Sequence, residues 1–292
     1  MGTPSIGFEG RLYVGATTLT EAYPFVSESL TETVAMTEDR GISGRPTKRS
    51  ERIVVATKDI AGDIVLEPTP AELDVWLPRI LGGTKTLNIV KLATTIPTFN
   101  VLINKGGDLH QFNTCAVNTA TFRFTVGEPV QLTLNVLGKT KTLPEAEPDV
   151  AITDNPPYVC HEAVLRIGGT IRETNEVTLT VNRNLQGLRR FSQTLTHVQE
   201  GPIAITFSPV LPFTADEVAL LALEATGATG QIVVTKGGNS CTFDLANVKF
   251  TGAGPTVGSR DGEILYNPTG TAFSTTSETN ADNALVVTSI LA

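Results

Sequence analysis

The chain has 292 residues and a formal net charge of −8, from 30 acidic and 22 basic residues. This balance argues against a protein that grips nucleic acid, because such binding depends on Lys and Arg neutralising phosphates. No apolar run approaches the ~20 residues that span a bilayer, so we expect no membrane insertion by this chain. The length suits two domains of roughly 150 residues. Short Thr- and Val-rich runs, separated by Gly, Pro, Asn or Asp, indicate a mainly β protein.

The three cysteines, Cys115, Cys160 and Cys241, cannot all pair within one chain. The opening residues lack the basic start and apolar stretch of a secretory signal. Both features favour synthesis in a reducing cytoplasm.

Residues 11–34 read as two strands separated by a turn at Thr20–Pro24, and residues 37–50 read as a polar loop with Gly and Pro. This loop carries a basic cluster. A solvated loop is one interpretation, and a flexible arm that docks on an acidic surface of another copy is the other. The candidate contact residues are Arg40, Gly41, Gly44, Arg45, Lys48 and Arg49.

A strand is expected at 53–55, and after a break it resumes over residues 60–67. A helix should begin at Pro70, since Thr69 and Glu72 have the spacing of a capping box. We expect Pro78 to end this helix early, because proline removes a backbone donor and constrains the residue before it. The apolar residues 73, 76 and 77 stand at helical spacing, which indicates packing rather than a cofactor site.

Strands follow at 89–92, 99–103 and 109–117, and Gly106-Gly107 marks a tight hairpin turn between the last two. Residues 121–126, 131–136 and 177–182 each alternate apolar with polar side chains, so each strand has one apolar and one polar face. The polar faces hold mostly hydroxyl and amide groups. Such a surface contacts water without binding a charged ligand tightly.

The stretch 144–157 is rich in proline and acidic residues, which is typical of a linker or extended arm. Another polar stretch, 274–283, precedes a last apolar strand at 284–290 that is expected to close a sheet. We therefore divide the chain into a first module at 1–143, a linker at 144–157 and a second module at 158–292.

The second module repeats the first. Residues 101–117, around Lys105-Gly-Gly, recur as 232–248 around Lys236-Gly-Gly. Residues 57–66 are echoed by 196–205, and a second Thr-x-x-Glu helix start stands at Thr214–Glu217. Three echoes in the same order favour a duplication.

The sequence contains few motifs that would indicate catalysis, metal binding or cofactor binding. His110, His161 and His197 lack metal-ligand spacing, and the Lys-Gly-Gly pairs lack the remainder of a phosphate-binding loop. No nucleophile elbow or dinucleotide fingerprint occurs, and the carboxylate pairs lie in the linker, where nothing desolvates them. We expect no catalytic residue, no metal and no cofactor.

One further set of motifs lies in the stretches Ser50–Arg52, Thr57–Asp74, Leu81–Gly83, Phe112–Asn118, Val130–Gly138 and Val177–Leu185. These stretches cover most of the chain when read with their downstream echoes. Together they resemble the tail tube proteins of long-tailed bacteriophages.

The resemblance implies two tandem β-sandwich or barrel modules, each with one short flanking α-helix, joined by the acidic linker. It implies a virion protein, made in the bacterial host cytoplasm, whose inner strands join between subunits around a channel. The basic loop then becomes the candidate contact between rings. The implied partners are other copies of the chain, the tape measure protein, the tail terminator and distal tail proteins, and double-stranded DNA that passes without specific binding.

Single-module members of the family form rings of six, so a two-module chain predicts a pseudo-hexameric trimer. Six chains per ring, with the second module outside, is the alternative. A host-surface or carbohydrate-binding β module is a competing class, but it should show clustered exposed aromatics, and the chain has one Trp and four Tyr. An envelope enzyme should show a His or carboxylate constellation and an export signal.

Overall fold

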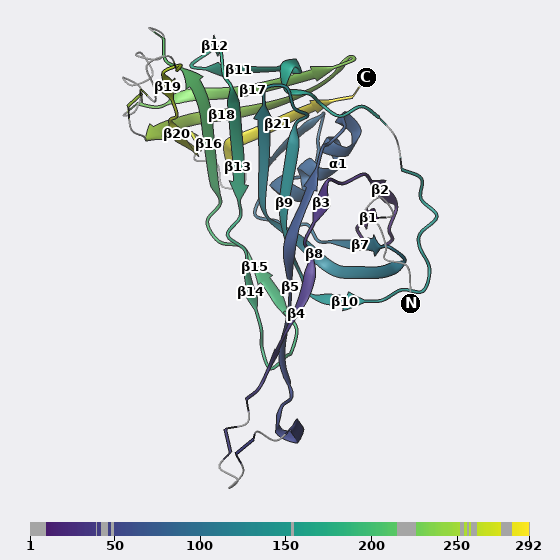
Figure 1. Cartoon of the computed structure of the whole chain (residues 1–292). Helices are drawn as coiled ribbons and strands as arrows, with labels where there is room; N and C mark the ends of the chain where they lie inside the picture. Colours follow the sequence, from purple (N-terminus) through teal and green to yellow (C-terminus); the bar gives the residue numbers. More distant parts are fainter. Residues whose placement is uncertain are drawn as a thin grey trace.

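The computed structural model describes residues 10–38, 40–41, 46–47, 50–152, 155–214, 226–251, 254–255, 257, 262–275 and 282–291. Within them the chain is mainly β, with one α-helix (Figure 1).

The first part of the chain holds β1 to β10, α1 and a 3-10 turn. Their bounds are β1 Arg11–Gly15, β2 Glu21–Tyr23, β3 Ser27–Glu28, β4 Thr31–Met36, η2 Ser50–Arg52, β5 Val55–Leu66, α1 Pro70–Leu81, β6 Ile89–Leu92, β7 Phe99–Lys105, β8 Asp108–Thr125, β9 Gln131–Gly138 and β10 Thr140–Thr142.

The second part holds a 3-10 turn and β11 to β21. Their bounds are η3 Cys160–Glu162, β11 Ala163–Ile167, β12 Thr170–Arg172, β13 Glu176–Asn182, β14 Gln186–Leu188, β15 His197–Gln199, β16 Ala204–Pro212, β17 Ala228–Lys236, β18 Asn239–Thr251, β19 Leu265–Tyr266, β20 Thr269–Phe273 and β21 Asp282–Ile290.

One antiparallel sheet runs through both parts of the chain. Its strands follow one another in the order β4, β5, β9, β8, β13, β16, β20 and β18. The junction between the parts is the pairing of β8 with β13, in which Thr121 lies opposite Thr180. We call these eight strands the long sheet.

A second layer covers the apolar face of the long sheet. In the first part it contains β2, β1, β7, the start of β8 and β10. In the second part it contains β12, β11, β17, the start of β18 and β21, and β6 joins it from the first part. Strands β8 and β18 belong to both layers because they are long.

The two halves use the same strand register around their Lys-Gly-Gly hairpins. Val101 lies opposite Phe112 in β7 and β8, and Ile232 lies opposite Phe243 in β17 and β18. Both members of the second pair stand 131 positions after those of the first. Gly106 and Gly107 have φ values of 71° and 101°, which side chains rarely tolerate, as the tight turn requires.

The core is continuous across the two halves. Phe122 of β8 packs on Phe243 of β18 with ring centroids 5.0 Å apart, and Phe124 lies 6.2 Å from the same ring. On the other side of the first half, Trp76 of α1 is fully buried and meets Phe99 edge to face. The helical spacing of residues 73, 76 and 77 therefore serves packing, as predicted.

The predicted start of α1 is confirmed, and its predicted end is wrong. Thr69 accepts a hydrogen bond from the backbone of Glu72, whose carboxylate accepts one from Thr69 N–H. Pro78 lies inside the helix, which continues to Leu81. The helix ends at Gly82, which has a φ of 82° and donates its N–H to the Pro78 carbonyl.

Three strand predictions also need correction. Residues 21–23, expected in a turn, form β2 and pair with β1. Strand β5 continues through the predicted break at 56–59, because β4 pairs along that stretch. Residues 109–117 and 121–125, expected within separate strands, belong to the single strand β8, which bends between its two layers through an irregular register near Asn118. Val126, expected to continue the second strand, lies in the turn after β8.

The described part of the predicted linker, 144–152 and 155–157, has no regular strand or helix but packs against the first half. Glu147 accepts a hydrogen bond from Tyr13 at 2.8 Å, and Val150 and Ile152 pack on the small cluster around Tyr13. The segment is thus held in place rather than extended into solvent.

Candidate assembly surfaces

The long sheet has a polar face opposite its core. Thr121 and Thr180 lie 3.3 Å apart across the joint between the halves, and Thr119 donates to Asn182 at 3.3 Å. Alternation places apolar partners such as Phe122 and Leu179 on the other side, where both are buried. The polar face consists of Asp59, Asp63, Thr119, Thr121, Arg123, Gln131, Thr133, Asn135, Glu176, Thr178, Thr180, Asn182, Thr206, Ser208, Thr269, Thr271, Lys249 and Thr251.

Charge on this face is sparse and largely compensated. Arg123 forms a bidentate pair with Glu176, at 2.8 and 3.3 Å, and this hydrogen bonding raises the pKa of the arginine. Asp63 accepts a hydrogen bond from Asn135 at 2.7 Å. With three acidic and two basic residues, the face is close to neutral and offers DNA no cluster of cations.

The long sheet has an open edge at each end. Within the described residues, β4 pairs only with β5, and the end of β18 at Lys249–Thr251 pairs only with β20. Open edges present unpaired N–H and C=O groups that another strand can bind. In contrast, the matching stretch of β8 is paired on both sides, with β9 and β13.

A long arm leaves the long sheet at the end of β4 and the start of β5 (Figure 1). Pairing of β5 with β9 begins only at Ile60, so residues 55–59 extend about 16 Å past the neighbouring strand at ~3.3 Å per residue. Four apolar side chains of the arm are exposed. They are Val34, Met36, Ile53 and Val54.

A second hairpin, β14 and β15, lies beside the arm and braces it (Figure 1). Arg189 pairs with Asp59, and Lys58 donates its backbone N–H to the Gln193 carbonyl at 2.7 Å. Gln193 in turn donates to the Val55 carbonyl at 3.2 Å. The base of the arm is therefore fixed by the second half of the chain.

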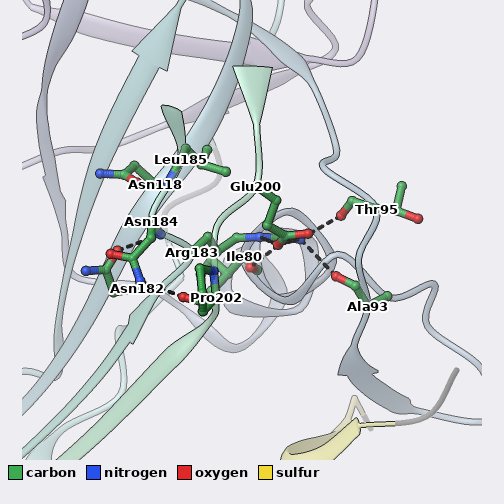
Figure 2. Close-up of polar contacts among 10 residues, drawn as sticks. All are labelled: Ile80, Ala93, Thr95, Asn118, Asn182, Arg183, Asn184, Leu185, Glu200 and Pro202. Carbon is green, nitrogen blue, oxygen red and sulfur yellow. Dashed lines mark hydrogen bonds and ion pairs between the residues drawn. The ribbon is translucent and has the colours of Figure 1, made fainter. Parts of the chain in front are cut away.

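Arg183, just after β13, ties the second half to the helix of the first (Figure 2). Its guanidinium donates to the Ile80 carbonyl at 3.2 Å, the Ala93 carbonyl at 2.9 Å and the Thr95 carbonyl at 2.8 Å. It also pairs with Glu200. A cation suits this place because the last carbonyls of α1 carry partial negative charge.

The strand end around Arg183 is fixed by asparagines (Figure 2). Arg183 donates its backbone N–H to the Asn118 carbonyl at 2.8 Å, and the Asn118 side chain accepts from Leu185 N–H at 2.8 Å. Asn184 has a φ of 49° and donates to the Pro202 carbonyl. The Asn-Arg-Asn sequence thus positions a buried cation, a role that sequence reasoning missed although it singled out this segment.

The predicted contact residues fall partly outside the described structure. Arg40 and Gly41 are described and lie in the arm, where Arg40 is exposed. Gly44, Arg45, Lys48 and Arg49 lie outside the described residues, so their role stays a prediction. The second predicted helix start, Thr214–Glu217, also lies outside them beyond Thr214 itself.

Reactive chemistry is sparse in the described part of the chain. It contains no cluster of three or more His, Cys, Asp or Glu able to hold a metal ion. The cysteines are free thiols, and burial raises the pKa of Cys115 to about 12. Among the described helical segments, none has the length and apolar character for a membrane crossing.

Comparison with known proteins gives one result. No curated protein matches the chain. A family model described as phage tail tube protein matches residues 6–285, nearly the whole length. The chain therefore belongs to the phage tail tube protein family, as its sequence motifs predict, and is a structural component of a phage tail.

Proposed function

We propose that the chain polymerises into stacked rings, each of three copies, around a channel for genome delivery. The main support for this proposal is that the long sheet passes from one half of the chain to the other through the β8–β13 pairing. If the same pairing recurs between copies, the sheets join into a closed barrel and no edge stays open.

The matching registers support a two-module reading of the chain. In the first half Tyr13 lies opposite Leu102, and in the second half Val164 lies opposite Val233. Val233 stands 131 positions after Leu102, as in the hairpins, so Val164 corresponds to Tyr13. We infer that β3 and β4 correspond to β13, so that β4 of one copy pairs with the end of β18 of the next.

The pattern of burial supports one register for this proposed junction. The 151-position offset from Tyr13 to Val164 relates Leu30 to Val181, and both are fully buried. On the other strand, Ala120 and Phe250 are both buried next to β9 and β20.

Within the chain, Thr121 lies opposite Thr180 and Thr119 lies opposite Asn182. The corresponding junction between copies places Ser29 opposite Thr251 and Thr31 opposite Lys249. The eight strands of each copy would give twenty-four in a ring of three. This arrangement favours three chains over six, because both modules then contribute to the channel wall.

We further propose that the polar face lines the channel and that tube assembly is the whole activity. Hydroxyl and amide groups keep the wall wet without binding phosphate tightly. Contacts with the tape measure, terminator and distal tail proteins belong to the two ends of such a tube. The competing carbohydrate-binding reading has no support from the large exposed side chains, which are mostly aliphatic and scattered.

Disulfide cross-linking tests the junction. In tubes of a Cys160→Ser background, Thr31→Cys with Lys249→Cys should form disulfides between copies and give a covalent ring of three on a denaturing gel. The matched control, Ala35→Cys with Lys249→Cys, displaces one partner by four residues, about 13 Å, and should stay uncross-linked. Equal cross-linking by both pairs, or none by the first in well-formed tubes, would refute this register.

A further inference from the structure

We propose that the outer face of the second half of the chain binds an extended segment of another protein. The outer face is the side of the second layer that points away from the core, on β11, β17, β18, β21 and β6. The bound segment carries aliphatic side chains at alternate positions and a carboxylate beside them. This proposal goes beyond tube assembly, and it can be tested on the purified chain without any tube.

In the first half the chain itself covers the corresponding face. Tyr13 and Leu102 lie outside the main core on this face, yet they are only 1% and 0% exposed. Val150 and Ile152, from the irregular segment between the halves, pack on them. The first half therefore shows what such a face binds, which is an extended stretch with aliphatic side chains two positions apart.

In the second half the matching residues remain accessible. Val164 lies opposite Val233 in β11 and β17, as Tyr13 lies opposite Leu102 in β1 and β7. Val164 is 38% exposed, and Val233 is also partly exposed. Accessible aliphatic side chains at a place that the first half covers indicate a surface for a partner.

The accessible residues continue as a row across the sheet. Val233 lies opposite Thr242, Thr242 lies opposite Thr288, and Thr288 lies opposite Ile89 of β6. All four side chains are partly exposed. They are also β-branched and therefore stiff, so a segment that packs on them costs little side-chain entropy.

A hollow with a partly unsatisfied arginine adjoins this row. Its volume is about 310 Å³, and its lining includes Arg166, Gln231 and Asp244. Gln231 donates to Asp244 at 2.7 Å, while Arg166 donates to Gln231 at 3.0 Å and makes no ion pair with any residue that the structure describes. A guanidinium has five N–H donors, so Arg166 keeps donors for a ligand. A carboxylate is the group that such a fork binds best.

The size of the face favours an extended segment over a folded partner. Five strands at ~4.8 Å span about 24 Å, and the row and its neighbouring rung cover about 7 Å along the strands. This area is far below the roughly 800 Å² that each partner buries in a stable interface between folded proteins. About seven extended residues match the width of the face. If the polar face lines the channel, the outer face lies outside the tube and is open to such a segment.

Attaching the cover of the first half to the second half tests the proposal. A second copy of the sequence Leu143–Ile152 is appended after Ala292 through a flexible Gly-Ser linker, which gives it a millimolar effective concentration near the face. In a Cys160→Ser background, Val233→Cys reports access through its rate of alkylation, because the two remaining natural cysteines are buried. The appended segment should slow this alkylation at least about tenfold.

Matched variants separate binding at this face from a general effect. Val126→Cys, in the exposed turn after β8, should react at the same rate with and without the appended segment. Serine at the places of Val150 and Ile152 in the appended copy should remove the protection. Arg166→Ala should weaken the protection at least about fivefold, because the carboxylate loses its partner. Equal alkylation of Val233→Cys with and without the appended segment would overturn the proposal.

Sedimentation of the purified chain decides between this partner and a second copy. At concentrations below those at which tubes grow, the chain should be a monomer, and Val233→Asp should leave it so. A dimer that Val233→Asp dissociates would mean that the face binds a second copy, and it would contradict the proposal. Neither measurement depends on tube formation, so a failure of the proposed function stays distinguishable from a failure of this inference.

Discussion

At the scale of single residues, Arg183 is the most demanding position in the chain. It is 1% exposed, and its hydrogen bonds end on three carbonyls and Glu200. A buried cation is tolerated only when its donors are satisfied, and here those acceptors come from both halves.

Replacing Arg183 with Ala should lower the free energy of unfolding by about 3–5 kcal/mol, because Glu200 and the carbonyls lose their donor. Chemical denaturation measures the change. Arg123→Ala is the matched control, since Arg123 also pairs with a glutamate but is about half exposed, and it should cost under about 1 kcal/mol. Equal losses in the two variants would show that Arg183 does not act as a buried tie.

Sequence could predict residues whose role is local. The Thr69–Glu72 capping box and the glycines of the Lys-Gly-Gly turns follow from spacing and backbone geometry. The role of Arg183 could not be predicted, because its acceptors at 80, 93 and 95 lie about ninety positions or more away in sequence. Only tertiary packing brings them together.

At the scale of elements, the arm contributes little buried apolar surface to the core of its own chain. Its aliphatic side chains Val34, Met36, Ile53 and Val54 are exposed rather than buried in the core. The notion of a docking arm in this stretch came from composition, while its direction and its brace by β14 and β15 required the structure.

Deleting Gly41–Arg49 should leave a folded chain that cannot build tubes. The long sheet and the β14–β15 brace do not depend on the deleted residues, so the midpoint of thermal unfolding should change little. Electron microscopy and light scattering measure assembly. Normal tubes from the deleted chain would show that the tip is dispensable.

Element boundaries were predicted less well than element types. Alternation correctly gave apolar and polar faces for 121–125, 131–136 and 177–182, because period two is read directly from sequence, but Val126 lies exposed in the turn after β8. It could not show that β8 is one strand through both layers. The rule for proline overrated Pro78, whose missing N–H costs one hydrogen bond while Leu77 and Ile80 on either side of it remain buried.

At the scale of the whole molecule, the wall of the proposed channel is nearly neutral. Thr121, Thr133 and Thr180 lie on the polar face of the long sheet, two of them across the joint between halves. Changing all three to Lys should still allow tubes, because these side chains point away from the core. Genome ejection should slow several-fold, and added salt should relieve the delay, since each cation offers the moving DNA a phosphate contact.

The control for that experiment carries the same added charge elsewhere. Thr84, Thr140 and Thr170 are exposed and lie off the polar face, so their replacement by Lys should leave ejection unchanged. The measurement compares the rate of genome ejection from virions that carry each triple variant. Equal rates for both triple variants would mean that the polar face does not border the DNA path.

The proposed ring of three depends on the proposal that the chain has two similar modules. The matching hairpin registers and the shared long sheet support both. Symmetry of the assembled tube is the most direct measurement, by electron cryomicroscopy of tube cross-sections. We predict three copies per ring, with both halves of each copy in an inner wall of twenty-four strands. Six copies per ring, with residues 158–292 outside the wall, would contradict it.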